Sequence, residues 1–328
     1  MEIDSSLISL LKRSAEEIRK SVIGKDDVII KILMTACAGG HILLEDIPGV
    51  GKTTMAVAFS KALSLEYNRM QFTADVMPAD VTGFYIPNRA TGEFDWKPGA
   101  VFCNLFLADE INRTSSKTQS ALLEAMEEGA VTVDSITRKL PEPFIVLATQ
   151  NPTGSAGTQL LPESQLDRFT IRLSMGYPTP HDEARILKAK SSKKTTPAVR
   201  PIMTAENLMT LRTAAENIFV SDEVYDYIAR LSAATRSDSR LELGVSPRGS
   251  LSAAAMAKCA AMFKGRTYVI PEDVMYIYPD VCAHRVIAAR VRGKRPDDSE
   301  VRRIITDICK GVPAPRLETA GRKQEAGK

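Results

Sequence analysis

The sequence predicts an α/β domain with a parallel sheet, followed by a second domain built of helices. Short apolar runs recur through the first half of the chain and alternate with segments of helical spacing, as in strand–helix–strand units. A glycine-rich loop joins the first of these runs, Ile42–Leu44, to the helix that follows it. Beyond residue 178 the apolar spacing is helical and no strong strand pattern remains.

Length and composition restrict the class of protein. The chain has 328 residues, of which 44% are hydrophobic and 25% charged, as expected for a globular protein large enough for two domains. The formal net charge is only +3, so no overall basic character indicates nucleic-acid binding. No apolar run approaches the ~18 residues that span a bilayer, and the acidic start, Met1–Asp4, does not resemble a signal peptide.

The cysteines indicate a reducing compartment. There are five, and none forms a Cys-x-x-Cys pair. Because their number is odd and their neighbours are apolar, we expect reduced thiols in the core of a cytoplasmic protein.

Two helices precede the glycine-rich loop. The first covers Ser6–Lys20 by apolar spacing, and the second opens at Asp26-Asp27 and ends at Gly39-Gly40. Between them lie Val22, Ile23 and Gly24. This segment is either a plain turn or an apolar wall for an adenine ring, and the sequence leaves both interpretations open.

The glycine-rich loop has the pattern of a phosphate-binding loop, because Lys-Thr opens the helix behind it. Gly49 and Gly51 lack a Cβ, so the backbone can curl its N–H groups around phosphate oxygens. Lys52 would reach the β- and γ-phosphates, and the Thr53 hydroxyl would hold Mg²⁺. The alternative is a turn with a surface lysine. The candidate nucleotide-binding residues are Asp46, Ile47, Pro48, Gly49, Val50, Gly51, Lys52, Thr53 and Thr54.

After a second strand, Tyr67–Phe72, comes a long stretch rich in glycine, proline and aromatic residues, Thr73–Val101. It is too long for an idle connection, which favours a functional insertion with a small hairpin around Arg89–Gly92. The alternative is that its aromatic side chains cover a local satellite core.

The apolar run Leu105–Ala108 ends in two acids, Asp109 and Glu110. An apolar run followed by two acids is common in proteins. The position of this run after a phosphate-binding loop favours a functional role for its two acids. We expect Asp109 to bind Mg²⁺ and Glu110 to act as general base toward the attacking water.

Two further side chains follow later strands. After a helix, Thr118–Glu128, the strand Phe144–Thr149 ends near Asn151, at the same edge of the sheet as Asp109 because parallel strands share their carboxyl edge. Asn151 could orient the attacking water, or simply cap the turn before a proline.

Arg168 precedes the last strand, Phe169–Leu173, and is displayed by a short helical turn. Its alternative role is a surface ion pair with Asp167 or Glu163.

In the second half, Ser246 and Pro247 are suited to the cap and first position of a helix. Arg248 then lies in the first turn, where a cation opposes the helix dipole and calls for a nearby anion such as a triphosphate. The alternative is an arginine that faces solvent.

Four motifs together resemble those of the MoxR family of AAA+ ATPases, in the helix-2-insert clade. They are Leu44–Thr53, Asp109–Arg113, Ala148–Pro152 and Leu166–Phe169, and the resemblance extends over nearly the whole chain. It implies a P-loop AAA+ core with a parallel five-stranded sheet of order 5-1-4-3-2 flanked by helices, and a C-terminal all-α lid. Asp46, in place of the first glycine of the loop consensus, looks like the family's own version.

The resemblance also implies roles for the candidate residues. Lys52 belongs to Walker A, Asp109 and Glu110 to Walker B, and Asn151 to sensor 1. Arg168 is similar to the arginine finger given to a neighbouring subunit, and Arg248 matches the sensor 2 arginine.

The implied domains are a nucleotide-binding core at 1–178, a helical lid at 179–315 and a disordered tail at 316–328. The stretch at about 73–101 corresponds to the helix-2 insert, and a hairpin at about 131–143 to the pre-sensor-1 hairpin.

The function that we expect is ATP hydrolysis with Mg²⁺ by a ring of identical subunits that remodels or matures a client protein. The resemblance implies that this ring is a hexamer. The resemblance points to clients with a von Willebrand factor A domain. Three other functions stay open: a nucleotide-gated scaffold with little turnover, a DNA-directed motor, and a metal-chelatase motor subunit. The hairpin's basic residues, Arg138 and Lys139, are too few to argue for DNA.

Overall fold

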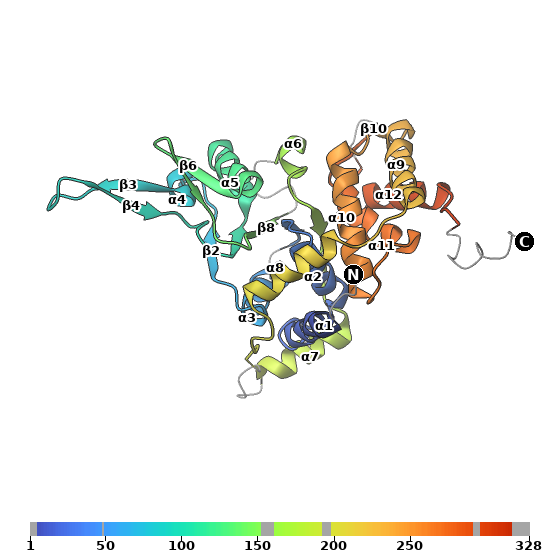
Figure 1. Cartoon of the computed structure of the whole chain (residues 1–328), viewed down its shortest axis with the longest axis horizontal. Coiled ribbons are helices and arrows are strands. Elements are labelled where there is room, and N and C mark those ends of the chain that lie inside the picture. Colours follow the sequence, from blue (N-terminus) through green and yellow to red (C-terminus); the bar gives the residue numbers. More distant parts are fainter. Residues whose placement is uncertain (1–4, 48, 152–160, 192–197, 291–295, 317–328) are drawn as a thin grey trace, which may run out of the picture. The chain divides into compact units, whose positions relative to one another are not determined.

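The computed structural model describes residues 5–47, 49–151, 161–191, 198–290 and 296–316 (Figure 1). The chain forms two compact units, Met1–Asn217 and Ile218–Lys328, which we describe separately. Pro48 and most of the predicted tail lie outside the described residues.

The first unit is built on a five-stranded sheet in which every neighbouring pair is parallel. Its order is β2-β5-β8-β1-β9, which confirms the predicted order 5-1-4-3-2 when the five strands are numbered along the chain. All five carboxyl ends therefore meet at one edge. The strands are β1 (Ile42–Glu45), β2 (Tyr67–Gln71), β5 (Leu105–Asp109), β8 (Ile145–Gln150) and β9 (Ile171–Leu173).

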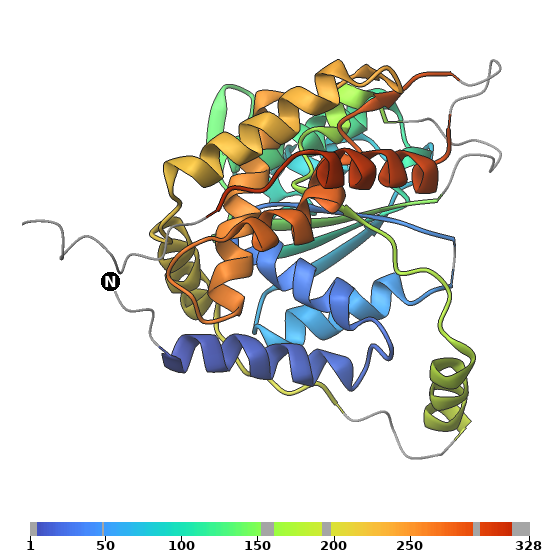
Figure 2. The ribbon, with the colours of Figure 1, turned by 90° about the vertical axis from the view of Figure 1, so that its right-hand side faces the viewer.

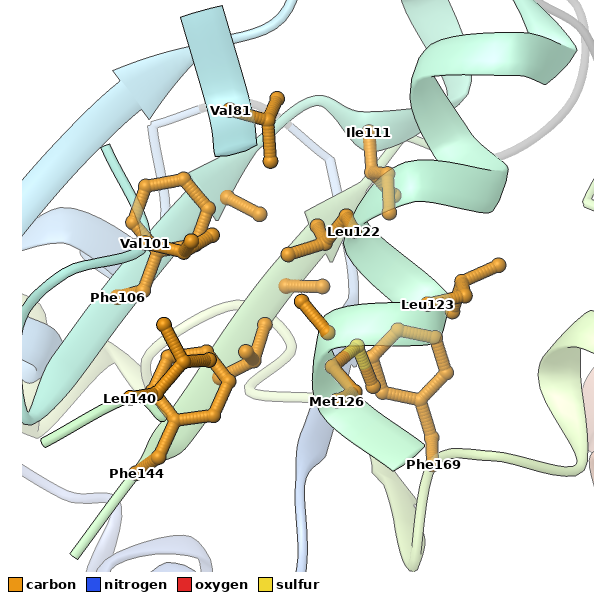
Figure 3. Close-up of a cluster of buried hydrophobic side chains, with 14 of the residues drawn as sticks. Val81, Val101, Phe106, Ile111, Leu122, Leu123, Met126, Leu140, Phe144 and Phe169 are labelled. Carbon is orange, nitrogen blue, oxygen red and sulfur yellow. The ribbon is translucent and has the colours of Figure 1, made fainter. Parts of the chain in front are cut away.

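One face of this sheet is covered by helix α5 (Ser116–Glu128). The close-up in Figure 3 shows Leu122 and Met126 of α5 within a cluster of buried side chains, where Met126 lies beside Phe169; Phe106 of β5 belongs to the same cluster. Both β5 and β8 are buried along their whole length, which explains why each is a continuous apolar run in the sequence.

Helices α1 (Ser5–Arg19), α2 (Asp26–Cys37) and α3 (Lys52–Ala62) lie on the other side of the sheet, as Figure 2 shows in blue. Helices α7 (Pro180–Ser191) and α8 (Ala205–Glu216) also belong to this unit, and α8 packs on α2. The contacts thus place these two helices in the same compact unit as the sheet. The predicted domain boundary after residue 178 stays a prediction.

The segment predicted as an insert contains a short helix, α4 (Pro78–Thr82), and an antiparallel hairpin of β3 (Gly83–Pro87) and β4 (Phe94–Pro98). A second hairpin pairs β6 (Ala130–Val133) with β7 (Ile136–Lys139).

The aromatic side chains of the insert divide into two groups. Trp96 packs against Tyr85 and Phe102, with ring centroids 5.3 and 5.9 Å apart, and forms a local satellite cluster. Phe84 and Phe94 are instead 41% and 68% exposed. The first group fits the structural interpretation of this stretch, and the second leaves apolar surface for a partner.

Among its described residues the second unit is mainly helical, and it contains a short antiparallel ribbon of β10 (Leu241–Leu243) and β11 (Ile287–Ala288) that the sequence pattern did not predict. Each of its strands is too short to give a period-two pattern. The helices α10 and α11 pack on each other, α9 packs on both, and α12 packs on α9 and α11. The helices are α9 (Asp222–Ser237), α10 (Pro247–Phe263), α11 (Pro271–Cys282) and α12 (Asp298–Gly311).

All five cysteines are buried free thiols, in agreement with the expectation of reduced core residues. Burial raises the pKa of the Cys37 thiol to about 12, so it stays protonated and unreactive.

His41 is a buried neutral histidine at the start of β1. Its Nδ1 accepts a hydrogen bond from the Val146 backbone N–H at 3.0 Å, so the ring proton lies on Nε2, which donates to the Met126 carbonyl at 3.0 Å. Burial lowers the pKa of His41 to about 4, from an ordinary value of 6.5.

We expect His41 to make the protein sensitive to mild acid. The unfolded chain binds a proton at His41 below pH 6.5 and the folded chain only below about 4, so stability is full above pH 6.5 and declines as the pH falls. Between pH 7.5 and pH 5, we expect protonation of His41 in the unfolded chain to lower the free energy of unfolding by about 2 kcal/mol.

Urea unfolding at the two pH values measures this loss. His41→Gln should reduce the pH dependence, whereas His181→Gln, at a histidine side chain that is 84% exposed, should leave it unchanged. Equal pH dependence in wild type and His41→Gln would contradict the assignment.

Candidate active site at the carboxyl edge of the sheet

The loop between β1 and α3 has the backbone conformation that a phosphate cradle requires. Gly49 and Gly51 have φ angles of 87° and 98°, in the left-handed region where a side chain is strained. Gly51 is also the N-cap of α3, so the free N–H groups of the first helical turn face the same loop. The Lys52 and Thr53 positions open that helix, as predicted.

Lys52 is buried within this loop, with 7% of its surface exposed. Its Nζ donates to the Asp46 carbonyl at 2.7 Å and to Asn151 Oδ1 at 3.2 Å. Burial lowers the pKa of Lys52, and the neighbouring carboxylates oppose this shift. The two acceptors are neutral, so the ammonium can exchange them for a more strongly attracting phosphate oxygen.

Glu110 follows β5 in a left-handed conformation, with φ at 58°. Its Oε1 accepts from Asn151 Nδ2 at 2.9 Å, and its Oε2 from Arg113 Nη1 at 2.7 Å. Burial raises the pKa of Glu110, but the hydrogen bonds from Arg113 and Asn151 outweigh it and the net pKa is lowered. The carboxylate is therefore ionised at neutral pH and able to accept a proton.

Asn151 joins the loop to the acid. Its amide accepts from Lys52 and donates to Glu110, so three residues separated by 99 and 41 positions in the chain form one hydrogen-bonded series. The sequence placed Asn151 at the same sheet edge as Asp109, and the structure brings it into direct contact with two other predicted residues. A role limited to capping the following turn does not account for both contacts.

Asp109, at the end of β5, is held by two residues that the sequence analysis missed. Its Oδ1 accepts from the Thr149 hydroxyl at 2.6 Å, and its Oδ2 from Arg69 Nη2 at 2.8 Å. The Thr149 hydroxyl also accepts from the Glu110 N–H at 2.9 Å. The sequence offered one sign of Thr149, namely a hydroxyl side chain in a run of mainly apolar residues.

The donors here suit Mg²⁺ better than a transition metal. Asp109 and the half-buried Thr53 supply hard oxygen ligands, and among the residues described there is no group of three or more His, Cys, Asp or Glu that could hold a metal alone. A cation at this place would need phosphate oxygens and water to complete its shell, as Mg²⁺ bound with a nucleotide does.

The predicted base-binding residues lie between α1 and α2. Ile23 is partly exposed, and Gly24 is exposed with φ at 72°. The next residue, Lys25, donates from Nζ to the carbonyls of Gly176 and Tyr177 at 3.1 and 3.0 Å. This loop is therefore fixed to the chain that follows β9.

Arg168 stands apart from the series around Asn151. Its Nε pairs with Glu127 Oε2 of α5 at 2.8 Å, rather than with the Asp167 or Glu163 considered above. It lines a pocket of about 580 Å³ beside the β6–β7 hairpin, together with Ser120, Glu124, Glu127, Glu128, Ala130, Thr132 and Thr137.

Arg248 belongs to the second unit. It is exposed in the first turn of α10, where the Ser246 side chain caps the helix by accepting from the Gly249 N–H at 3.2 Å. The predicted cap is thus present, and the predicted contact of Arg248 with a nucleotide stays a prediction.

Comparison with known proteins identifies the family. A family model described as "ATPase family associated with various cellular activities (AAA)" matches residues 41–171, and one described as "AAA lid domain" matches residues 233–308. The chain is 42% identical over 325 residues to YeaC of Bacillus subtilis, covering 98% of this chain and 100% of that protein. It is 38% identical over 289 residues to the chaperone MoxR1 of Mycobacterium tuberculosis, covering 85% and 76%. The chain belongs to the MoxR family of AAA+ ATPases.

A solved structure agrees with this assignment. A protein from Cytophaga hutchinsonii aligns with a TM-score of 0.86 at 34% identity, covering 95% of this chain and 96% of that one. The resemblance and the fold class that the sequence predicted for this MoxR-family chain are thus confirmed. Among its described helices, none has the length and apolar character that a membrane crossing requires.

We expect Thr149 to hold the two acids of this MoxR-family chain in place. Thr149→Val keeps the shape of the side chain but removes a fully buried hydroxyl that makes two hydrogen bonds. Urea unfolding should show a loss of about 1–3 kcal/mol, because Asp109 and the Glu110 N–H are left unsatisfied.

Thr149→Ser is the matched control, since it keeps the hydroxyl and should retain more stability than the valine variant. Greater stability of Thr149→Val than of Thr149→Ser would contradict this role.

Proposed function

We propose that this chain is an ATP hydrolase that uses Mg²⁺. The observation that carries the proposal is the series Lys52–Asn151–Glu110, which connects a buried cation in a phosphate-type loop to an ionised acid through one amide. A cation for the phosphates and a base for water, held at a fixed spacing, are what hydrolysis of a phosphoanhydride needs.

The proposed reaction follows from these positions. The loop N–H groups and Lys52 bind the phosphates, while Asp109 and Thr53 would hold Mg²⁺, which supplies further neutralisation of phosphate charge. Asn151 orients a water whose proton passes to Glu110 as its oxygen bonds to the γ-phosphorus. The bond to the β-phosphate oxygen breaks, and ADP and phosphate leave.

Two arginines complete the proposed site. Arg168 would leave Glu127 and reach the γ-phosphate of a neighbouring subunit, an effect worth roughly 10³–10⁵ in rate for such fingers. Arg248 would report loss of the γ-phosphate to the helical domain. Both roles require a ring, and we propose a hexamer.

We further propose that the work done is remodelling or maturation of a client protein in the cytoplasm, with von Willebrand factor A domain proteins as the expected clients. Support comes from the relative MoxR1, which is named a chaperone, and from the exposed apolar residues of the insert.

A DNA-directed motor has less support than a protein remodeller. The guanidinium of Arg138 lies 4.1 Å from the centre of the Trp96 ring and Nη2 donates to the Tyr85 hydroxyl, so one of the two basic residues of the hairpin is already engaged. A scaffold with little turnover is separated from a motor by the first experiment below.

We expect Lys52→Ala to abolish ATP binding and Glu110→Gln to bind ATP without turning it over. The first variant removes the buried cation, and the second removes only the proton acceptor. Fluorescent-nucleotide titration and steady-state phosphate release measure the two steps. Lys61→Ala, an exposed change in the last turn of the same helix, is the control and should behave as wild type.

Equal turnover in Glu110→Gln and wild type would remove the catalytic assignment. Tight ATP binding by wild type with negligible phosphate release from the assembled ring would favour the scaffold.

We expect two inactive variants to restore each other when their subunits are mixed. In a mixed ring, an Arg168→Ala subunit keeps its own Glu110 and receives Arg168 from a Glu110→Gln neighbour. Phosphate release should therefore rise above that of either variant alone. No recovery in rings shown to be mixed would exclude Arg168 as a residue acting in trans.

A further inference from the structure

The first position of the phosphate loop carries a carboxylate that faces away from the loop. Asp46 is 6% exposed. Its backbone serves the loop and the sheet, because the N–H donates to the Gln150 carbonyl at 3.2 Å and the carbonyl accepts from Lys52 Nζ at 2.7 Å.

The side chain of Asp46 serves a different segment, Ser174–Tyr177, which follows β9 and which we call the bridging segment. Oδ1 accepts from the Ser174 hydroxyl and from the Gly176 N–H, both at 3.1 Å. Oδ2 accepts from the Met175 N–H and, at 3.3 Å, from the Gly176 N–H. Gly176 has φ at 60°, a left-handed conformation suited to glycine.

The bridging segment is held on its other side by the loop between α1 and α2. Lys25 Nζ donates to the carbonyls of Gly176 and Tyr177 at 3.1 and 3.0 Å. Gly24 lies so close to the start of α7 that a Cβ added there would stand 2.3 Å from Asp182 Oδ2. Gly176 thus gives its N–H to Asp46 and its carbonyl to Lys25.

We propose that Asp46 is a positioning residue that sets the distance between the phosphate loop and the base-binding loop, acting through the bridging segment. This inference rests on the proposed function and on the interpretation of the loop between α1 and α2 as a wall for the adenine, in which Ile23 and Gly24 would face the base while Gly49–Thr53 hold the phosphates. In this role the Asp46 carboxylate acts through the bridging segment, from which it accepts its hydrogen bonds, and not through a contact with the nucleotide. It aligns two half-sites so that one molecule can occupy both.

The charge of Asp46 allows an experiment to distinguish alignment of the two loops from a purely local effect on the phosphate loop. A carboxylate in a loop that binds a triphosphate repels the ligand, so removal of the charge alone should tighten phosphate binding. Loss of alignment should instead weaken any ligand that spans both loops. The two effects have opposite signs for ATP, and only the first acts on inorganic tripolyphosphate.

The test is the binding of ATP and of tripolyphosphate to Asp46→Asn, measured by calorimetry on the full chain. The variant keeps the size of the side chain but presents an NH₂ group to backbone donors. We expect the Kd for ATP to rise roughly tenfold or more, as for loss of a hydrogen bond to a charged group. The Kd for tripolyphosphate should stay the same or fall.

Glu45→Gln is the matched control. Glu45 is the preceding acid, and it pairs with Arg172 at 2.9 Å across the same two strands, β1 and β9. It should leave the ratio of the two affinities unchanged.

Lys25→Met provides a second variant, should Asp46→Asn fold poorly. It removes the other attachment of the bridging segment and should show the same pattern, weaker ATP binding with tripolyphosphate unaffected.

Four results would overturn the inference. Parallel weakening of ATP and tripolyphosphate would make Asp46 a local support of the phosphate loop. An unchanged or tighter Kd for ATP would show that alignment does not depend on it. If wild type binds no ATP, the proposed function fails and this inference fails with it. If wild type binds ATP and the two variants Asp46→Asn and Glu45→Gln have the same ratio of ATP to tripolyphosphate affinity, only this inference fails.

Discussion

The site depends on one side-chain amide between a buried cation and a partly buried acid. Asn151 accepts from Lys52 and donates to Glu110, so the two charged groups are held at a fixed spacing without a direct ion pair. A direct pair would bind both charges tightly and leave neither for a ligand. The amide has one acceptor and one donor end and satisfies both groups at once. The cation therefore remains available to an anion, and the acid to a proton.

The parallel sheet makes this arrangement possible, and it also explains what the sequence could predict. Glu110 and Asn151 follow closely after apolar runs, and Lys52 follows the glycine-rich loop after another. Because parallel strands end at one edge, these three residues could be expected near one another. The strand order could be predicted only through family resemblance, because periodicity does not reveal which strands are neighbours. The helical second unit followed from spacing, but its ribbon of five strand residues was too short to leave a pattern.

Supporting contacts could not be predicted, because they depend on register and side-chain direction. Thr149 lies between Asp109 and Glu110 only because β5 and β8 pair with Leu107 beside Leu147 and Ala108 beside Ala148. Asp46 was recognised as a departure from the loop consensus, yet nothing in its neighbours indicates that its carboxylate binds chain about 130 residues away. Arg168 was considered in two ion pairs with near neighbours, and it pairs with Glu127 instead. The residues next to a side chain in the sequence do not show which distant residue it contacts.

Helix α5 contacts both the turn that follows Glu110 and the base of the insert. The chain after Glu110 forms a single turn, η1 (Ile111–Arg113), whose first carbonyl accepts from Gln119 of α5 at 3.1 Å. In the first turn of α5, Thr118 donates to the Val76 carbonyl at 2.8 Å, at the base of the insert. Farther out, Arg138 joins the β6–β7 hairpin that follows α5 to the aromatic residues of the insert. Helix α5 thus contacts the turn that follows Glu110 at one end, and it also packs on α4 of the insert and on β6 of the second hairpin. Because packed elements deform little independently, Glu110 and the insert belong to one contiguous set of contacts.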